Sequence, residues 1–166
     1  MTKRVVVLQQ GNHFVAGVFS DLGLFSTSIP TNSIKSAIRS VKADRLARED
    51  RPEDLETLKY VFDVMNGIKI PLNKIRFDFS GLSPKQVAVL EVTRTIPFGK
   101  TKTYGEVADD ARLPNASRFV GNVMASNRFA PLIPCHRVVA ASGLGGYGFG
   151  ISTKKELLSK EGAFAD

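Results

Sequence analysis

The chain has 166 residues, enough for a sizeable core in one domain or two small ones. Hydrophobic residues make up 43% and charged residues 23%, which is typical of a folded protein and excludes a disordered one. The net charge of +7 favours a polyanionic partner, nucleic acid ahead of an anionic membrane. Without a run of roughly 18 apolar residues or a signal-peptide core, we expect a cytoplasmic protein, or a nuclear one in a eukaryotic source.

The first eighty residues predict a small antiparallel sheet. Strands are expected at residues 4–9, 13–19 and 24–28, because β-branched and aromatic residues there are separated by turn residues. Residues 75–79 alternate apolar and polar side chains and predict one more strand. With the helices between these strands, residues 1–80 are expected to form an α/β (α+β) supporting domain.

Two helices are expected within this domain. Asn32 or Ser33 can cap a helix that runs towards Arg48, with apolar residues on one stripe. Pro52 opens a second helix that continues to Met65, where Asn-Gly stops it.

Residues 83–166 predict a second, mainly helical domain. Ser-Pro at residue 83 opens a helix that ends before Ile-Pro at residue 96. Thr103, with a glutamate three residues later, matches a capping box for a helix over 104–111. After a break at Leu-Pro-Asn, a further helix is expected from about residue 116 to 125. Two short helices joined by a tight turn outline a helix-turn-helix, although many helical hairpins bind no DNA.

The second helix of this pair has two different faces. Its apolar face contains Val120, Val123 and Met124. The other face contains Arg118, Gly121, Asn122 and Ala125. Small residues on an outward face allow close approach to a partner, whereas a solvated face with one ordinary arginine is the alternative.

Cys135, the only cysteine, follows in the sequence Pro134-Cys135-His136-Arg137. A single cysteine cannot form an internal disulfide, so it is a buried inert thiol, an intermolecular link or a reactive nucleophile. Neighbouring histidine and arginine can stabilise a thiolate and favour the nucleophile. A buried thiol acting as a small hydrophobe stays open on these four residues alone.

A glycine-rich segment and a last helix follow the cysteine. Residues 143–150 contain five glycines, but they match neither a P-loop nor a dinucleotide-binding pattern, so a turned loop that walls a pocket is expected. Ser152 or Thr153 is expected to cap a helix over residues 154–160, with Glu161 at its end.

Five sequence blocks in this half recur together in one known family. They are Ile96-Pro97-Phe98-Gly99, Thr103-Tyr104-Gly105-Glu106-Val107-Ala108, Arg118-Phe119-Val120-Gly121 with Asn127, Ile133-Pro134-Cys135-His136-Arg137-Val138-Val139, and Lys155-Glu156-Leu157-Leu158 followed by Glu161-Gly162. In this order they resemble the methylated-DNA-protein-cysteine methyltransferases, also called O6-alkylguanine-DNA alkyltransferases.

The resemblance implies direct-reversal DNA repair. A helix-turn-helix would bind duplex DNA in the minor groove, an O6-alkylguanine would be flipped out, and its alkyl group would pass irreversibly to the cysteine. O4-alkylthymine is a possible second substrate in the family. The protein would act as a monomer, be consumed in one turnover, and need no cofactor or metal. The zinc ligands of some members cannot form here, because the chain has no second cysteine and only His13 besides His136.

The resemblance also implies residue roles. Cys135 is the acceptor, His136 takes its proton through a water, Glu161 orients the histidine, Tyr104 gives a proton to the leaving guanine, and Asn127 braces the turn. The implied DNA contacts are Tyr104, Ser117, Arg118, Gly121, Asn122, Ala125 and Arg128, with Arg118 replacing the flipped base. The implied pocket residues are Pro134, Val138, Tyr147, Gly148 and Phe149, of which Phe149 is larger than the residue often found there.

Two other functions compete with this one. A damage sensor or helix-turn-helix regulator would hold DNA without transfer, but it would not need the complete set of reaction residues. A cysteine hydrolase is disfavoured, because its base usually lies far from the cysteine in sequence and only His13 is left for that position.

Overall fold

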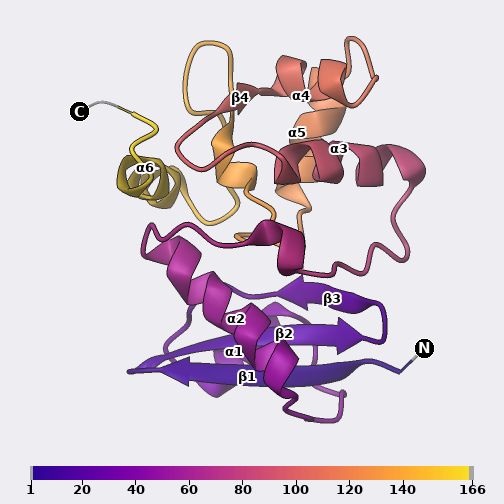
Figure 1. Cartoon of the computed structure of the whole chain (residues 1–166), viewed down its shortest axis with the longest axis vertical. Coiled ribbons are helices and arrows are strands. Elements are labelled where there is room, and N and C mark those ends of the chain that lie inside the picture. The colour runs from indigo at the N-terminus through magenta and orange to yellow at the C-terminus, as the bar shows by residue number, and fades with distance from the viewer. Residues whose placement is uncertain (1, 165–166) are drawn as a thin grey trace. The chain divides into compact units, whose positions relative to one another are not determined.

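A computed structural model of the protein describes residues 2–164 and divides the chain into two compact units (Figure 1). Unit 1 consists of residues 2–65, 69–80 and 128–132, and unit 2 of residues 66–68, 81–127 and 133–164. The expected domain boundary at residues 80–83 differs from these units in two short segments: residues 66–68 belong to unit 2, and residues 128–132 belong to unit 1. The predicted fold class is confirmed: an α/β unit with a small antiparallel sheet, and a mainly helical unit. None of the described helices is long and apolar enough to cross a membrane.

Unit 1 is built on a three-stranded antiparallel sheet. Its strands are β1 (Arg4–Gln10), β2 (His13–Ser20) and β3 (Gly23–Thr27), in that order, as predicted. Val6 lies opposite Gly17 in the β1–β2 register. A Cβ at Gly17 would lie 2.7 Å from the Leu58 side chain, so glycine lets a helix pack closely against this face of the sheet.

Two helices cover opposite faces of the sheet. α1 (Ile34–Ser40) places Ala37 in a buried cluster with alternate residues of β1 and β2, such as Val5 and Val18. α2 (Pro52–Met65) packs on the face that contains Gly17. Figure 1 shows α2 in front of the sheet and α1 behind it. This arrangement buries apolar side chains on both faces of the sheet.

The prediction of a helix that runs towards Arg48 is wrong in length, because α1 ends at Ser40. Lys42 adopts a left-handed conformation (φ 55°), and the Ala43 amide donates to the Ile38 carbonyl at 3.1 Å. Such bonds close a helix C-terminus, a position that glycine usually signals in sequence. Val41 and Ala43 are buried, so core packing offsets the strain of a non-glycine residue here.

The strand expected at residues 75–79 is also wrong. The segment forms only one parallel bridge, Leu24 with Phe77. Leu24 donates its amide to the Arg76 carbonyl at 2.9 Å and accepts from the Asp78 amide at 2.8 Å. The apolar and polar alternation has another cause, because Asp78 is buried and hydrogen-bonded to the Ser20 hydroxyl. Before it, η1 (Leu72–Lys74) forms a single 3-10 turn.

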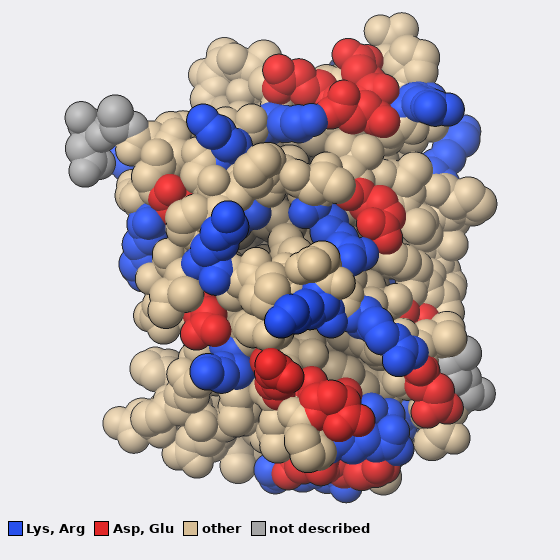
Figure 2. Space-filling view, in the orientation of Figure 1, with Lys and Arg blue, Asp and Glu red and all other residues tan. Residues whose placement is uncertain are grey.

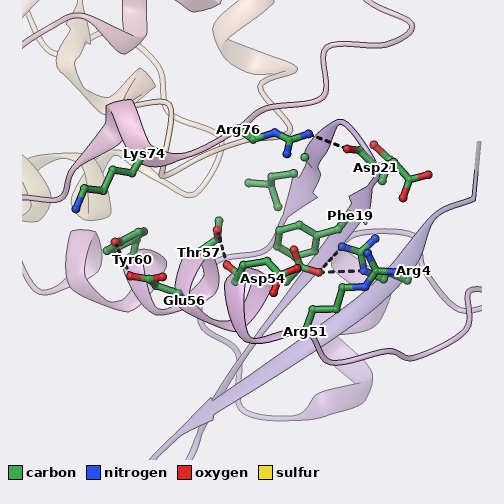
Figure 3. A pocket seen from close by; sticks show the side chains of 14 residues that line it. Arg4, Phe19, Asp21, Arg51, Asp54, Glu56, Thr57, Tyr60, Lys74 and Arg76 are labelled. Atoms are coloured by element: carbon green, nitrogen blue, oxygen red, sulfur yellow. Dashed lines mark hydrogen bonds and ion pairs between the residues drawn. The ribbon is translucent and has the colours of Figure 1, made fainter.

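A polar pocket of about 320 Å³ lies within unit 1 (Figure 3). Its charged lining residues are Arg4, Arg51, Lys74 and Arg76 and, with opposite charge, Asp21, Glu53, Asp54 and Glu56. Several of these groups already bond within the unit: Arg4 Nε donates to Asp54 at 3.0 Å, and Arg76 donates to the Asp21 carbonyl at 2.8 Å. The pocket is charge-balanced and its buried ion pair supports the fold of unit 1.

Unit 2 contains four helices and a two-stranded parallel ladder. The helices are α3 (Pro84–Arg94), α4 (Tyr104–Asp110), α5 (Ser117–Ala125) and α6 (Ile151–Lys160), and the strands are β4 (Lys102–Thr103) and β5 (Val138–Val139). Capping boxes start α3 at Ser83 and α4 at Thr103, and the second of these is the one predicted.

The predicted cap of the last helix is wrong. α6 starts at Ile151 after Gly150, whose φ is 98°, and no side chain caps it. Ser152 and Thr153 therefore lie inside its first turn. Lys154 lies on the buried side of the helix, together with Leu157 and Leu158.

Candidate active site

The two short helices of unit 2 form the predicted helix-turn-helix. α4 and α5 pack together, and the turn between them contains Arg112 (φ 60°) and Asn115 (φ 61°) in left-handed conformations. α5 buries Val120, Val123 and Met124 and leaves Ser117, Arg118, Asn122 and Ala125 exposed, with Gly121 half-buried. The outward face is therefore the small-residue face that the sequence predicts.

Cys135 starts the 3-10 turn η2 (Cys135–Arg137), directly after Pro134. Its side chain is 6% exposed, and it lines a pocket of about 280 Å³. The other lining residues are Tyr104, Gly121, Met124, Ala125, Gly146, Tyr147 and Gly148. Asn127 Nδ2 donates to the Ile133 carbonyl at 2.9 Å, which fixes the chain two residues before the cysteine. The helix-turn-helix and the thiol therefore share one pocket.

His136 and Glu161 form a buried pair behind the cysteine. His136 Nε2 lies 2.7 Å from Glu161 Oε1, and neither side chain is more than 1% exposed. Burial lowers the pKa of His136 although Glu161 opposes this, so the ring is neutral at pH 7. Burial alone would raise the pKa of Glu161, but hydrogen bonds from His136 and Arg137 lower it to about 2. The pair is a neutral imidazole oriented by a carboxylate.

Arg137 completes this network, a role that sequence reasoning missed. Its Nε donates to Glu161 Oε2 at 2.9 Å and its Nη2 to Oε1 at 3.0 Å, which is a bidentate contact. Its Nη1 donates to the Ile96 carbonyl at 2.8 Å. The sequence suggested that Arg137 stabilises the thiolate, whereas the structure directs it to Glu161.

Lys154 is the second residue that sequence reasoning missed. It is fully buried, and its Nζ donates to the carbonyls of Val138 (2.6 Å) and Gly146 (3.0 Å). Burial lowers the pKa of Lys154 to about 8, although the charge of Cys135 acts in the opposite direction and raises this pKa. Burial also raises the pKa of the Cys135 thiol, and Asn127 and Lys154 counteract this. Lys154 thus joins β5 to the glycine loop and places a cation near the thiol.

The glycine loop approaches Tyr104 more closely than any other residue type would allow. A Cβ at Gly145 (φ 71°) would lie 2.6 Å from the Tyr104 hydroxyl. Further along the loop, the Tyr147 ring makes edge contacts with His136 (6.5 Å between centroids) and with Phe149 (5.5 Å). Phe149 is 39% exposed beside this wall. The loop therefore walls the pocket, as expected from the glycines.

Two more residues that the resemblance implies, Val138 for the pocket and Arg128 for DNA, lie in different environments. Val138 is buried in β5 and accepts the Lys154 hydrogen bond. Arg128 belongs to unit 1, where its guanidinium donates to the Asp78 and Ser80 carbonyls and stacks 3.8 Å from the Phe25 ring centroid. These contacts give Arg128 a structural role within unit 1, and its contact with DNA stays a prediction.

The described residues offer no site for a metal ion. Within residues 2–164, no three His, Cys, Asp or Glu side chains come together as metal ligands. Fold and site together define a helix-turn-helix protein with a single buried thiol in a pocket, next to a neutral histidine that is oriented by a carboxylate.

Comparison with known proteins agrees with this class. A family model described as 6-O-methylguanine DNA methyltransferase, DNA binding domain, matches residues 84–163. A methylated-DNA--protein-cysteine methyltransferase from Mycobacterium bovis is 44% identical over 88 residues, 52% of this chain and 53% of that protein. One from Scheffersomyces stipitis is 35% identical over 133 residues, 78% of this chain and 66% of that protein. The aligned part thus spans about half the length of the mycobacterial relative.

Solved structures resemble the whole chain. A crystal structure of Mycobacterium tuberculosis OGT in complex with DNA has a TM-score of 0.74 and 26% identity, covering 96% of this chain and 93% of that one. The O6-methylguanine-DNA methyltransferase of Pyrococcus kodakaraensis has a TM-score of 0.68 and 25% identity, covering 95% and 99%. The chain belongs to the methylated-DNA-protein-cysteine methyltransferase family, so the resemblance seen in the sequence is confirmed.

Proposed function

We propose that this protein repairs DNA by moving the alkyl group of O6-alkylguanine in a duplex onto Cys135, once per molecule. The observation that carries the proposal is the pocketed thiol of Cys135 with the His136–Glu161 pair behind it. The name shared by its relatives points to the same reaction. Since the substrate is genomic DNA, the compartment would be the cytoplasm, or the nucleus in a eukaryote.

The chemistry needs a thiolate and a protonated leaving base. His136 takes the thiol proton through a water, and its charged form is held by Glu161. The sulfur then attacks the alkyl carbon, a C–S bond forms, and the C–O6 bond breaks with its electron pair moving to the guanine. The Tyr104 hydroxyl gives a proton to the guanine ring, because an anionic purine leaves poorly. No step reverses the thioether, so the protein is consumed.

Recognition of the duplex is assigned to α5. Its exposed face has small side chains, which allow close approach in the minor groove, and Ser117 and Asn122 add hydrogen-bonding groups. Arg118 at the start of this helix would fill the space left by the flipped base. The protein would bind one duplex as a monomer.

One experiment tests the function. The protein is incubated with duplex DNA that contains O6-methylguanine, and its intact mass is measured. A gain of one methyl group is expected, located on the peptide with Cys135 and absent from Cys135→Ala. An unchanged mass with DNA still bound would instead identify a damage sensor.

Replacing Arg118 with alanine is expected to slow repair of duplex DNA by about 10–100-fold, because extruding a base costs a few kcal/mol that Arg118 offsets. The rate is measured as methyl uptake in single-turnover assays. Repair of a single-stranded oligonucleotide should change little, since no base pair has to open. Arg39→Ala, an exposed arginine of α1, is the charge-matched control. Duplex repair by Arg118→Ala at the wild-type rate would exclude the base-replacing role.

A further inference from the structure

The segment between α5 and Cys135 passes through both units. The chain leaves unit 2 after Asn127, runs through unit 1 at residues 128–132, and returns to unit 2 at Ile133. We call residues 127–134 the strap. A hydrogen bond from Asn127 Nδ2 to the Ile133 carbonyl, at 2.9 Å, joins its two ends. A short, closed loop therefore connects α5 to the thiol.

Arg128, the second residue of the strap, is bound to unit 1 by both its side chain and its main chain. Its Nη2 donates to the Asp78 carbonyl at 2.8 Å and to the Ser80 carbonyl at 2.9 Å, and its Cζ lies 3.8 Å from the centroid of the Phe25 ring. Its own carbonyl accepts from the Thr27 amide at 2.9 Å. These contacts form the Arg128 clamp, which leaves the backbone at the start of the strap little freedom.

Placing a guanidinium at this position costs free energy. Burial lowers the pKa of Arg128 although the charge of Asp78 opposes this, so the positive charge lies in an unfavourable environment. Its Nε is buried and has no hydrogen-bond partner within residues 2–164. An apolar side chain could fill the same space without removing a charge from water. Packing alone therefore does not account for the arginine, whereas a need for one fixed orientation does, because a planar guanidinium both stacks and donates in a set direction.

The neighbouring Asn127 is the residue on which the clamp acts. Burial raises the pKa of the Cys135 thiol, and a hydrogen bond from the Asn127 side chain counteracts part of this rise. The same side chain donates to the Ile133 carbonyl. One amide can reach both groups only from a well-defined backbone position, so a displaced Asn127 would lose one of the two bonds.

We propose that Arg128 is a positioning residue: its clamp in unit 1 holds the strap so that Asn127 can stabilise the Cys135 thiolate. Unit 1 thereby takes part in the reaction, through the strap rather than through a group of its own at the sulfur. The effect on alkyl transfer rests on the proposed function, whereas the effect on thiol ionisation does not.

Other charged and titratable groups around the thiol stay in place when Arg128 is changed. They are Lys154 and Glu161 of the α6 segment, His136 and Arg137 of η2, Tyr104 of α4, and Tyr147 of the glycine loop. All of them belong to unit 2, whereas the side-chain contacts of the Arg128 clamp are with unit 1. A change in thiol ionisation after substitution of Arg128 is therefore carried by the strap.

The test measures the rate of iodoacetamide labelling against pH, which reports one thiol because the chain has a single cysteine. For Arg128→Leu we expect the profile to move up by about 0.5–1 pH unit and methyl transfer at pH 7 to slow by about 3–10-fold, because fewer thiols are ionised. Arg128→Lys keeps a cation beside Phe25 and should recover part of both losses. Lys3→Met removes the other cation over the same ring, 3.4 Å from its centroid, and is the matched control that should change neither.

Combined substitutions test the route through Asn127. In an Asn127→Ala background, Arg128→Leu should move the labelling profile no further, because the hydrogen bond that the clamp positions is already absent. A second shift of the same size would overturn the inference. Val41→Ala, in the buried cluster beneath α1, is the stability control. It should lower the unfolding temperature at least as much as Arg128→Leu and leave labelling unchanged; an equal shift would assign the effect to general destabilisation and overturn the clamp.

An unshifted labelling profile for Arg128→Leu also overturns the inference. If duplex binding weakens instead, with a smaller salt dependence, Arg128 contacts a phosphate, as the resemblance implies. Labelling needs no DNA, so an absence of methyl uptake by the wild type would count against the proposed function only.

Discussion

Glu161→Gln is expected to slow methyl transfer by about 10²–10⁴-fold and to lower the free energy of unfolding by about 3–5 kcal/mol. The carboxylate accepts from both His136 and Arg137, which are buried with it. A glutamine amide cannot accept on both sides. If its NH₂ faces His136, the ring must move its hydrogen to Nδ1 and loses the acceptor that the thiol proton needs. If the NH₂ faces Arg137, a buried guanidinium meets a donor.

The stability effect should depend on pH in a defined direction. Glu161 has a native pKa of about 2 against 4.5 when unperturbed, so its contribution is complete above pH 4.5 and is lost as the pH falls towards 2. The difference between wild type and Glu161→Gln, measured by denaturant unfolding, should shrink over that interval. Glu156→Gln, an exposed glutamate of α6 paired with Lys160, is the control. A constant difference down to pH 2 would contradict the assignment.

Lys154→Met is expected to impair the reaction more than it weakens the fold. The ammonium group lies near the thiol in a buried environment, where a nearby opposite charge lowers a pKa by about 1–3 units. Its removal should move the Cys135 labelling profile up by that amount and slow methyl transfer at pH 7 by tenfold or more, on the order of one pKa unit. Above pH 8 the wild type loses its own charge at Lys154, so the two rates should converge.

The stability of the same variant gives an opposite signal. Lys154 has a native pKa of about 8 and an unperturbed value of 10.5, so the unfolded chain binds more protons between these values. The free energy of unfolding of the wild type should therefore rise from pH 8 to 10.5 relative to Lys154→Met. Below pH 8 the loss of the hydrogen bonds to the Val138 and Gly146 carbonyls opposes the gain from removing a buried charge, so the two stabilities should differ little. Lys155→Met, at the exposed neighbouring position, should leave both transfer and stability unchanged.

The parts of the fold that the sequence predicted are those with local causes. β-Branched and aromatic residues with turn residues between them marked β1 to β3, and Thr103 marked the start of α4. The errors came from tertiary contacts. α1 ends where Val41 is buried in the core, and no glycine marks this end in the sequence. The expected strand at 75–79 owes its alternation to a buried Asp78.

The site was predictable to a similar degree. The motif placed Cys135, His136 and Glu161 together, and the structure brings His136 and Glu161 to hydrogen-bonding distance. Lys154 could have been found from spacing, since it lies three and four residues before the buried Leu157 and Leu158. The contact of Arg137 with Glu161 could not, because it joins residues 24 positions apart through a turn.

The position of the segment Arg128–Leu132 limits how the chain can be divided into stable fragments. It lies between α5 and Cys135 in sequence, yet it belongs to unit 1, where the Phe129 ring packs edge-on against Phe77 and Phe79 and the Thr27 amide donates to the Arg128 carbonyl. A fragment that starts at residue 83 would keep the motif blocks but leave the fully buried Phe129 without these partners. The chain therefore passes from unit 2 into unit 1 and back, and a fragment of residues 83–166 should be less stable than the same residues in the whole chain.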